Sequence, residues 1–236
     1  MTPQRRVTGY ESIVPFNPLD YGNLTKNFVD ELMARGPFKL PLDRPFLGVG
    51  VYALFYTGDD HVYEQFRSSD STDPIYVGKA AAAGARKGDK DEMLATAQLY
   101  RRLVQHTTSI QAVENLSIED FRCRYLVVEP LWVAMAESFL ITKFKPLWNL
   151  ELDGFGNHDP GKGRHAGEIT LWDAHHPGRP WAKSLRQTRT REQTTERILD
   201  FARRRREDPR SLNELAESVA AADASNTDNE VHDETL

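Results

Sequence analysis

Residues 48–56 read Gly-Val-Gly-Val-Tyr-Ala-Leu-Phe-Tyr, and this stretch decides the fold. Its β-branched and aromatic residues are typical of a buried strand, and the following Thr57-Gly58-Asp59 is typical of a turn. A second strand is predicted after Asp73-Pro74, where the chain reads Tyr76-Val77-Gly78-Lys79. Each strand carries a tyrosine beside a glycine. Two phenols on one surface, next to backbone that a ligand can approach closely, suit the binding of a phosphate.

A third strand is predicted at Phe121–Val128, and helices are predicted at 93–106 and 131–144. The first helix begins near Asp91-Glu92, where acidic groups favour the helix N-terminus. The second follows Pro130 and ends before Pro146. The pattern indicates the α+β class, with a small, three-stranded, largely antiparallel sheet flanked by helices.

Four segments are expected along the chain. Residues 1–46 form an N-terminal arm with one helical stretch from Leu24 to Arg35, and residues 47–150 form the core. Residues 151–213 form a basic extension that is rich in loops and ends in a helix at about 192–206. Residues 214–236 are acidic, small and polar, which is typical of a disordered tail.

The charge distribution permits nucleic-acid binding although the formal net charge is −5. From Ser211 onward there are 7 acidic residues and no lysine or arginine, so the rest of the chain carries +2. Residues 161–210 carry 13 basic and 7 acidic residues. The chain has 1 cysteine, Cys123, no apolar signal segment after Met1 and no apolar run long enough to span a membrane. A soluble cytoplasmic protein is expected.

Four further polar residues follow the two strands in an informative order. Arg102 and His106 lie four residues apart, so they share a helix face, although a solvated basic face is the simpler interpretation. Glu137 interrupts an apolar helix, where a carboxylate needs either a cation or an ion pair with Arg122 or Arg124. Asn149 follows Pro146-Leu147-Trp148.

This order of tyrosine, tyrosine, arginine with histidine, glutamate and asparagine resembles the GIY-YIG nuclease family. The closest resemblance is to its type II restriction endonucleases that cut CCGCGG. It extends from about Leu47 to Asn149, with a weaker similarity at 154–161. Valine replaces isoleucine in both signature triplets. The segment Asp59–Asp73 is longer than in compact members and is expected to be an inserted loop.

The resemblance implies a role for each residue. Tyr52 orients or deprotonates the attacking water, and Tyr76 positions the scissile phosphate. Arg102 binds that phosphate through its planar guanidinium, and His106 accepts a proton near neutral pH. Glu137 holds one Mg²⁺, with Mn²⁺ as a substitute. Asn149 fixes a neighbouring side chain or a phosphate oxygen, with a turn cap as the alternative.

The resemblance also implies partners. The expected substrate is double-stranded DNA, the expected assembly is a homodimer that matches a palindrome, and a DNA methyltransferase is the expected functional companion. Two rivals stay open: a homing or repair nuclease with the same module, and a non-catalytic nucleic-acid-binding module. The candidate DNA contacts are Lys79, Asn157, His158, Lys162 and Arg164.

Overall fold

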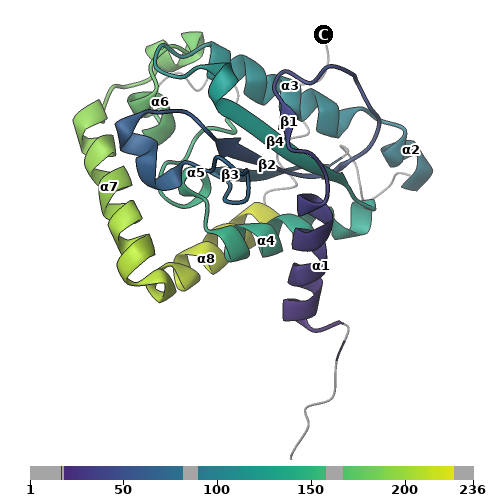
Figure 1. Ribbon diagram of the computed structural model, residues 1–236. Coiled ribbons are helices and arrows are strands. Elements are labelled where there is room, and N and C mark those ends of the chain that lie inside the picture. Colours follow the sequence, from purple (N-terminus) through teal and green to yellow (C-terminus); the bar gives the residue numbers. More distant parts are fainter. Residues whose placement is uncertain (1–16, 18, 82–89, 158–166, 226–236) are drawn as a thin grey trace, which may run out of the picture.

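The computed structural model describes residues 17, 19–81, 90–157 and 167–225 (Figure 1). One antiparallel sheet contains the strands β1 (Phe38–Lys39), β2 (Gly50–Tyr56), β3 (Tyr76–Ala80) and β4 (Phe121–Val127), in the order β1-β4-β2-β3. Every residue of β2 is buried because this strand lies inside the sheet and is covered on both faces. The α+β class and the antiparallel sheet are therefore confirmed.

The sheet has four strands rather than the expected three. The additional strand, β1, pairs through Phe38 with Cys123 and through Lys39 with Arg122 of β4. Strand β1 has 2 residues and lies between Pro37 and Pro41. It is too short to give an alternating pattern, so the sequence did not indicate it. Arg124 of β4 holds this part of the chain in place by donating to the carbonyl oxygens of Met33 and Arg35, each at 2.8 Å.

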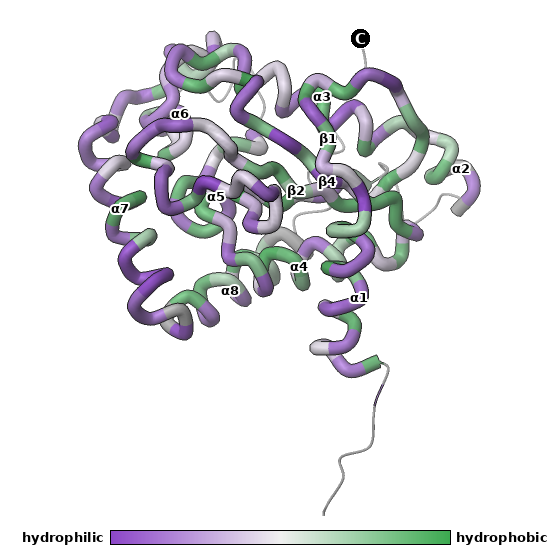
Figure 2. The backbone as a smooth tube through the Cα atoms, viewed as in Figure 1, coloured by the Kyte–Doolittle hydropathy of each residue, from purple (hydrophilic) through white to green (hydrophobic). Residues whose placement is uncertain are grey.

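The helices are α1 (Tyr21–Met33), α2 (Lys90–Leu94), α3 (Gln98–Gln111), α4 (Val133–Phe144), α5 (Leu147–Leu150), α6 (Leu171–His175), α7 (Arg191–Glu207) and α8 (Asn213–Ser225). Helices α3 and α4 cover opposite faces of the sheet (Figure 1). In Figure 2 the hydrophobic colour gathers on β2 and α4, whereas α7 is largely hydrophilic. Within the described residues, no helix combines the length and apolar composition needed to cross a membrane.

The helix expected at 93–106 is divided into α2 and α3. The backbone at this break binds Gly48. The N–H of Gly48 donates to the carbonyl of Thr96 at 2.6 Å, and the N–H of Leu99 donates to the carbonyl of Gly48 at 3.0 Å. These bonds fix the beginning of α3 against the residues that lead into β2. The expected helix at 131–144 is confirmed as α4, which follows the 3₁₀ turn Pro130–Trp132.

The segment 59–73 is more ordered than an inserted loop. It contains a 3₁₀ helix, η1 (His61–Phe66), whose Val62, Tyr63 and Phe66 are buried. Asp60 caps this helix by accepting from the N–H of Val62 at 2.8 Å. The insertion is therefore part of the core.

The expectation of disorder from residue 214 is wrong as far as residue 225, because α8 packs against α4. Ala216 and Ala220 of α8 are buried, and their spacing of four residues places them on one helix face; Leu212, at the end of the 3₁₀ turn before α8, is buried as well. Ser138 of α4 donates to the carbonyl of Ala220 at 3.1 Å. The acidic composition concealed this narrow apolar face. Residues 226–236 lie outside the described part of the chain.

Candidate active site

Tyr52 lies at the centre of the site because its strand partner across β3 is a glycine. Tyr52 pairs with Gly78, and a Cβ added to Gly78 would lie 2.3 Å from the Tyr52 hydroxyl oxygen. Any side chain at position 78 would therefore occupy the place of the phenol. Gly78, the glycine of the second triplet, thus leaves the space in which Tyr52, the tyrosine of the first triplet, extends over the edge strand.

His106 and Tyr76 lie on the same face of the sheet as Tyr52. The Tyr52 hydroxyl is 2.5 Å from Nε2 of His106, and both side chains are buried. The ring of Tyr76 lies 6.2 Å from that of Tyr52 and 5.4 Å from that of His106. The two phenols and the imidazole thus form one contiguous group.

Arg102 lies one helical turn before His106 on α3 and joins the same group. Its guanidinium donates to the carbonyl of Gly156 at 3.1 Å and to Oε1 of Gln105 at 3.3 Å. Burial raises the pKa of Tyr52 to about 12, although the charge of Arg102 and a hydrogen bond to it lower that pKa. At neutral pH the phenol therefore keeps its proton and can donate it to Nε2 of His106.

Glu137 is a buried carboxylate on α4, and its partner is a lysine. Nζ of Lys79 is 2.5 Å from Oε2 of Glu137, and the two side chains are 14% and 6% exposed. The predicted alternative, a pair with Arg122 or Arg124, is not what the structure contains. Arg124 binds backbone carbonyls, and Arg122 donates to the carbonyls of Glu119 and Phe121.

Glu137 and the two phenols approach the edge strand from opposite faces of the sheet. Lys79 follows Gly78 in β3, so its side chain leaves the face opposite to Tyr52. Strand β3 is an edge strand of the described sheet, so no further strand of that sheet lies beside it, and Gly78 carries no side chain. The negative charge of Glu137 contributes to raising the pKa of Tyr52, which indicates that the carboxylate acts on the phenol across this edge.

Asn149 supports β3 along its open edge. Its Oδ1 accepts from the N–H of Val77 and its Nδ2 donates to the carbonyl of Val77, both at 2.8 Å. Next to it, Trp148 N–H donates to the carbonyl of Ile75 at 3.0 Å. The Asn149 amide thus fixes the backbone of Val77, and through it the positions of the neighbouring Tyr76 and Gly78.

A family model of the Eco29kI GIY-YIG domain matches residues 44–202, about two thirds of the chain. No curated protein matches the chain. The chain belongs to the Eco29kI GIY-YIG family.

This family assignment makes the chain a restriction-endonuclease-type nuclease that acts on DNA. The match begins close to the expected start of the core at residue 47 and continues past 150 to residue 202. It therefore includes α6 and most of α7 as well as the tyrosines. The boundaries proposed for the four segments stay predictions.

The site of this GIY-YIG chain offers one carboxylate for a metal ion. Among the described residues, no group of three or more histidine, cysteine, aspartate or glutamate side chains is arranged to hold a metal. Mg²⁺ commonly takes one or two carboxylates and completes its shell with water and substrate phosphate. Glu137 fits that single-carboxylate role, with Lys79 as the cation that neutralises it here.

The candidate DNA contacts divide into three kinds. Lys79 is bound to Glu137 rather than extended from the surface. Asn157 is exposed, as a DNA contact requires. His158, Lys162 and Arg164 lie outside the described residues.

Sequence reasoning did not identify two residues that shape the site. Phe155 stacks on His106, with ring centroids 4.5 Å apart and an interplanar angle of 18°, and packs edge-on against Tyr76 at 4.9 Å. Arg179 is 2% exposed and binds the segment that contains Phe155. The weak similarity at 154–161 was the signal for Phe155. No motif surrounds Arg179.

The adjacent pair His175-His176 forms part of a buried polar network and does not contribute to the site. Nδ1 of His175 is 2.8 Å from the hydroxyl of Thr194, and the ring of His176 bridges the hydroxyl of Tyr63 at 2.6 Å and Oδ1 of Asn115 at 2.9 Å. Burial lowers the pKa of His175 to about 4, with a smaller contribution from the charge of Arg191. Burial also lowers the pKa of His176 well below its usual value.

These histidines predict acid-sensitive stability. The unfolded chain binds protons on both residues below about pH 6.5, whereas the folded chain does not, so stability is lost as the pH falls from about 6.5 to 4. For His175 the full loss is on the order of 3 kcal/mol. Urea unfolding at several pH values in this range measures it. His175→Gln should flatten the slope, and His61→Gln, at an exposed residue, should not. Equal slopes in all three proteins would contradict the assignment.

Proposed function

We propose that this chain is a type II restriction endonuclease that hydrolyses one phosphodiester in each strand of duplex DNA at the palindrome CCGCGG. The products are 5′-phosphate and 3′-hydroxyl ends. The observation that carries the proposal is the bond between Tyr52 and Nε2 of His106, beside Tyr76 and Arg102 and within the electrostatic reach of Glu137.

The buried pair of Tyr52 and His106 can move one proton in a defined direction. A phenol with a pKa of about 12 is not itself a base at neutral pH. As the attacking water transfers a proton to the Tyr52 oxygen, the phenolic proton passes to Nε2 of His106 at 2.5 Å. Tyr52 therefore orients the water, and His106 is the final acceptor.

Arg102 and Tyr76 act on the phosphate. The guanidinium of Arg102 can offer two parallel N–H donors to phosphate oxygens and so offset the charge that develops as the water attacks. Tyr76 lies on the same face and its hydroxyl is close to Gly156, which limits the position that a phosphate oxygen can take. Glu137 would hold Mg²⁺, or Mn²⁺ in its place, and the ion would stabilise charge on the leaving 3′ oxygen.

Symmetry and setting complete the proposal. A palindrome with one cut in each strand calls for a homodimer with one site per protomer. A restriction enzyme also requires a DNA methyltransferase that protects the host target. The single cysteine, Cys123, is a buried free thiol, which is consistent with action in the reducing cytoplasm.

Digestion of two plasmids that differ only in one CCGCGG site tests the proposal. We expect one cut at that site with Mg²⁺ or Mn²⁺, no cut with a chelator, and identical ends on repeated end-sequencing. Cutting of long asymmetric or branched DNA instead would favour a homing or repair nuclease. Binding without cutting in either metal would favour the non-catalytic module and reject the enzyme.

A further inference from the structure

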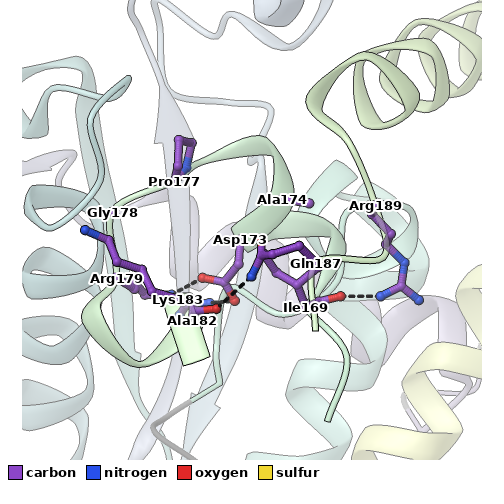
Figure 3. Close-up of a pocket in the computed structure, with 10 residues that line it drawn as sticks. All are labelled: Ile169, Asp173, Ala174, Pro177, Gly178, Arg179, Ala182, Lys183, Gln187 and Arg189. Carbon is purple, nitrogen blue, oxygen red and sulfur yellow. Dashed lines mark hydrogen bonds and ion pairs between the residues drawn. The ribbon is translucent and has the colours of Figure 1, made fainter. Parts of the chain in front are cut away.

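Arg179 is a buried cation with an unusually complete set of partners. Its Nε and Nη2 each donate to one carboxylate oxygen of Asp173 at 2.6 Å. The guanidinium carbon lies over two indoles, 4.6 Å from the ring centre of Trp172 and 4.5 Å from that of Trp181. Arg179 and Asp173 face each other beside a cavity of about 320 Å³ (Figure 3). None of the predicted catalytic residues lines that cavity.

The remaining donors of Arg179 all bind one short segment of backbone. Nη2 donates to the carbonyl of Gly154 at 2.9 Å, and Nη1 donates to the carbonyls of Phe155 and Asn157, each at 3.1 Å. A guanidinium has five N–H groups, and here each of them has an acceptor. A lysine has three donors without the planar fork, so it cannot reproduce this pattern.

The segment 154–157 forms one wall of the active site. The carbonyl of Gly156, the residue between two of the bound carbonyls, accepts from Nη2 of Arg102 at 3.1 Å. Phe155 stacks on His106. A Cβ at Gly156 would lie 2.9 Å from the Tyr76 hydroxyl oxygen and 3.2 Å from Nη2 of Arg102, so the segment passes close to Tyr76 and Arg102. Its backbone position therefore sets where Arg102 and His106 can lie.

We propose that Arg179 is a positioning residue for DNA cleavage. Anchored on Asp173 of α6, it fixes the backbone at 154–157, which in turn orients Arg102 through Gly156 and His106 through Phe155. This inference rests on the proposed nuclease function for its consequence in catalysis. The orientation of His106 is independent of that function. An arginine with a purely structural role would bind backbone from several separate elements. All three carbonyls bound by Arg179 instead belong to the segment that contacts the site.

The test compares Arg179→Lys with a matched control, Arg124→Lys. Arg124 is also buried and also donates to three backbone carbonyls, those of Ser71, Met33 and Arg35, on the other face of the sheet. Both variants are expected to lower the unfolding midpoint. In single-turnover cleavage we expect R179K to be slower by about 30-fold or more with DNA affinity within about threefold, and R124K to stay within about threefold in both.

A second readout does not depend on cleavage. The Phe155 ring lies over His106, so its ring current shields the His106 ring protons in the wild-type ¹H NMR spectrum. In R179K those resonances should move downfield, and in R124K they should not; a His106→Gln spectrum assigns them. If wild type never cuts DNA but this shift occurs, the nuclease proposal fails, and the part of the inference that survives is that Arg179 orients His106.

If R179K does not fold, Trp181→Leu replaces it. This change removes one indole from the guanidinium and leaves all five hydrogen bonds. We expect a cleavage rate lower by about 3- to 10-fold, with DNA affinity unchanged and a smaller downfield shift of His106. The inference is overturned if either variant folds and cuts at the wild-type rate with unshifted His106 resonances. It is equally overturned if R124K slows cleavage as much as R179K does.

Discussion

A Glu137→Gln variant will bind DNA as the wild-type chain does and will cut it more slowly by on the order of 10³-fold or more. The amide keeps the size of the carboxylate and one acceptor for Lys79, but it removes the negative charge. The negative charge of Glu137 acts on Tyr52, and the pair with Lys79 places the carboxylate beside the edge strand. The metal ion that we propose would therefore lose its carboxylate ligand. Gel-shift binding and single-turnover cleavage at several Mg²⁺ concentrations separate the two effects.

Glu151→Gln is the matched control for this change. Glu151 is also a buried carboxylate, paired with Arg197 at 2.7 Å and with Arg204 at 2.9 Å, and it joins the end of α5 to α7. Breaking the buried pair of Glu137 and Lys79 costs up to about 3–5 kcal/mol of stability. The arginine partners of Glu151 are 52% and 38% exposed, so Glu151→Gln costs less, but both variants will unfold more readily. Only Glu137→Gln should lose cleavage. Equal losses of cleavage would mean that stability, and not charge at the site, explains the effect.

The strands that carry the tyrosines were readable from the sequence because they are long, apolar and bounded by turn residues. Strand β2, the edge strand β3 and β4 lie where the pattern predicts them. Strand β1 and helix α8 were not predicted. The first has two residues, and the second hides a narrow alanine-rich face within an acidic stretch. In both cases tertiary contacts with β4 and α4 decide the structure, and local propensity does not.

The candidates Tyr52 and Tyr76 were identifiable because the pairing of β2 with β3 places both on one face of the sheet. Arg102 and His106 share a helix face by their separation of four residues, and the resemblance supplied the rest. The partner of Glu137 was not identifiable. Lys79 and Glu137 are 58 positions apart in the sequence and come together only because α4 packs against the edge strand. Arg179 was missed for the same reason, since its partners at 154–157 are defined by the tertiary fold.

Replacing Gly78 by alanine will slow cleavage by on the order of 10²-fold, because the new Cβ takes the place of the Tyr52 phenol. At position 78 that carbon would lie 2.3 Å from the Tyr52 oxygen, 2.6 Å from its Cζ and 3.1 Å from Cε1 of Tyr76. Tyr52 is fully buried, so its ring cannot rotate into solvent to relieve the contact. The hydroxyl must leave His106. Overpacking will also cost about 1–3 kcal/mol of stability. Single-turnover cleavage and urea unfolding measure the two effects.

Gly58→Ala separates strain from chemistry. A Cβ at Gly58 would lie 2.5 Å from the hydroxyl of Tyr56, a similar clash with a tyrosine that belongs to the core and not to the site, and 2.6 Å from Cγ of Asp120. Both glycine variants should lose similar stability, and only Gly78→Ala should lose cleavage. In a Tyr52→Phe background, Gly78→Ala should slow cleavage by less than about threefold more, because the hydroxyl is already absent. Full additivity there would show that Gly78 acts on the reaction by another route than Tyr52, and the explanation of the second signature glycine would then be wrong.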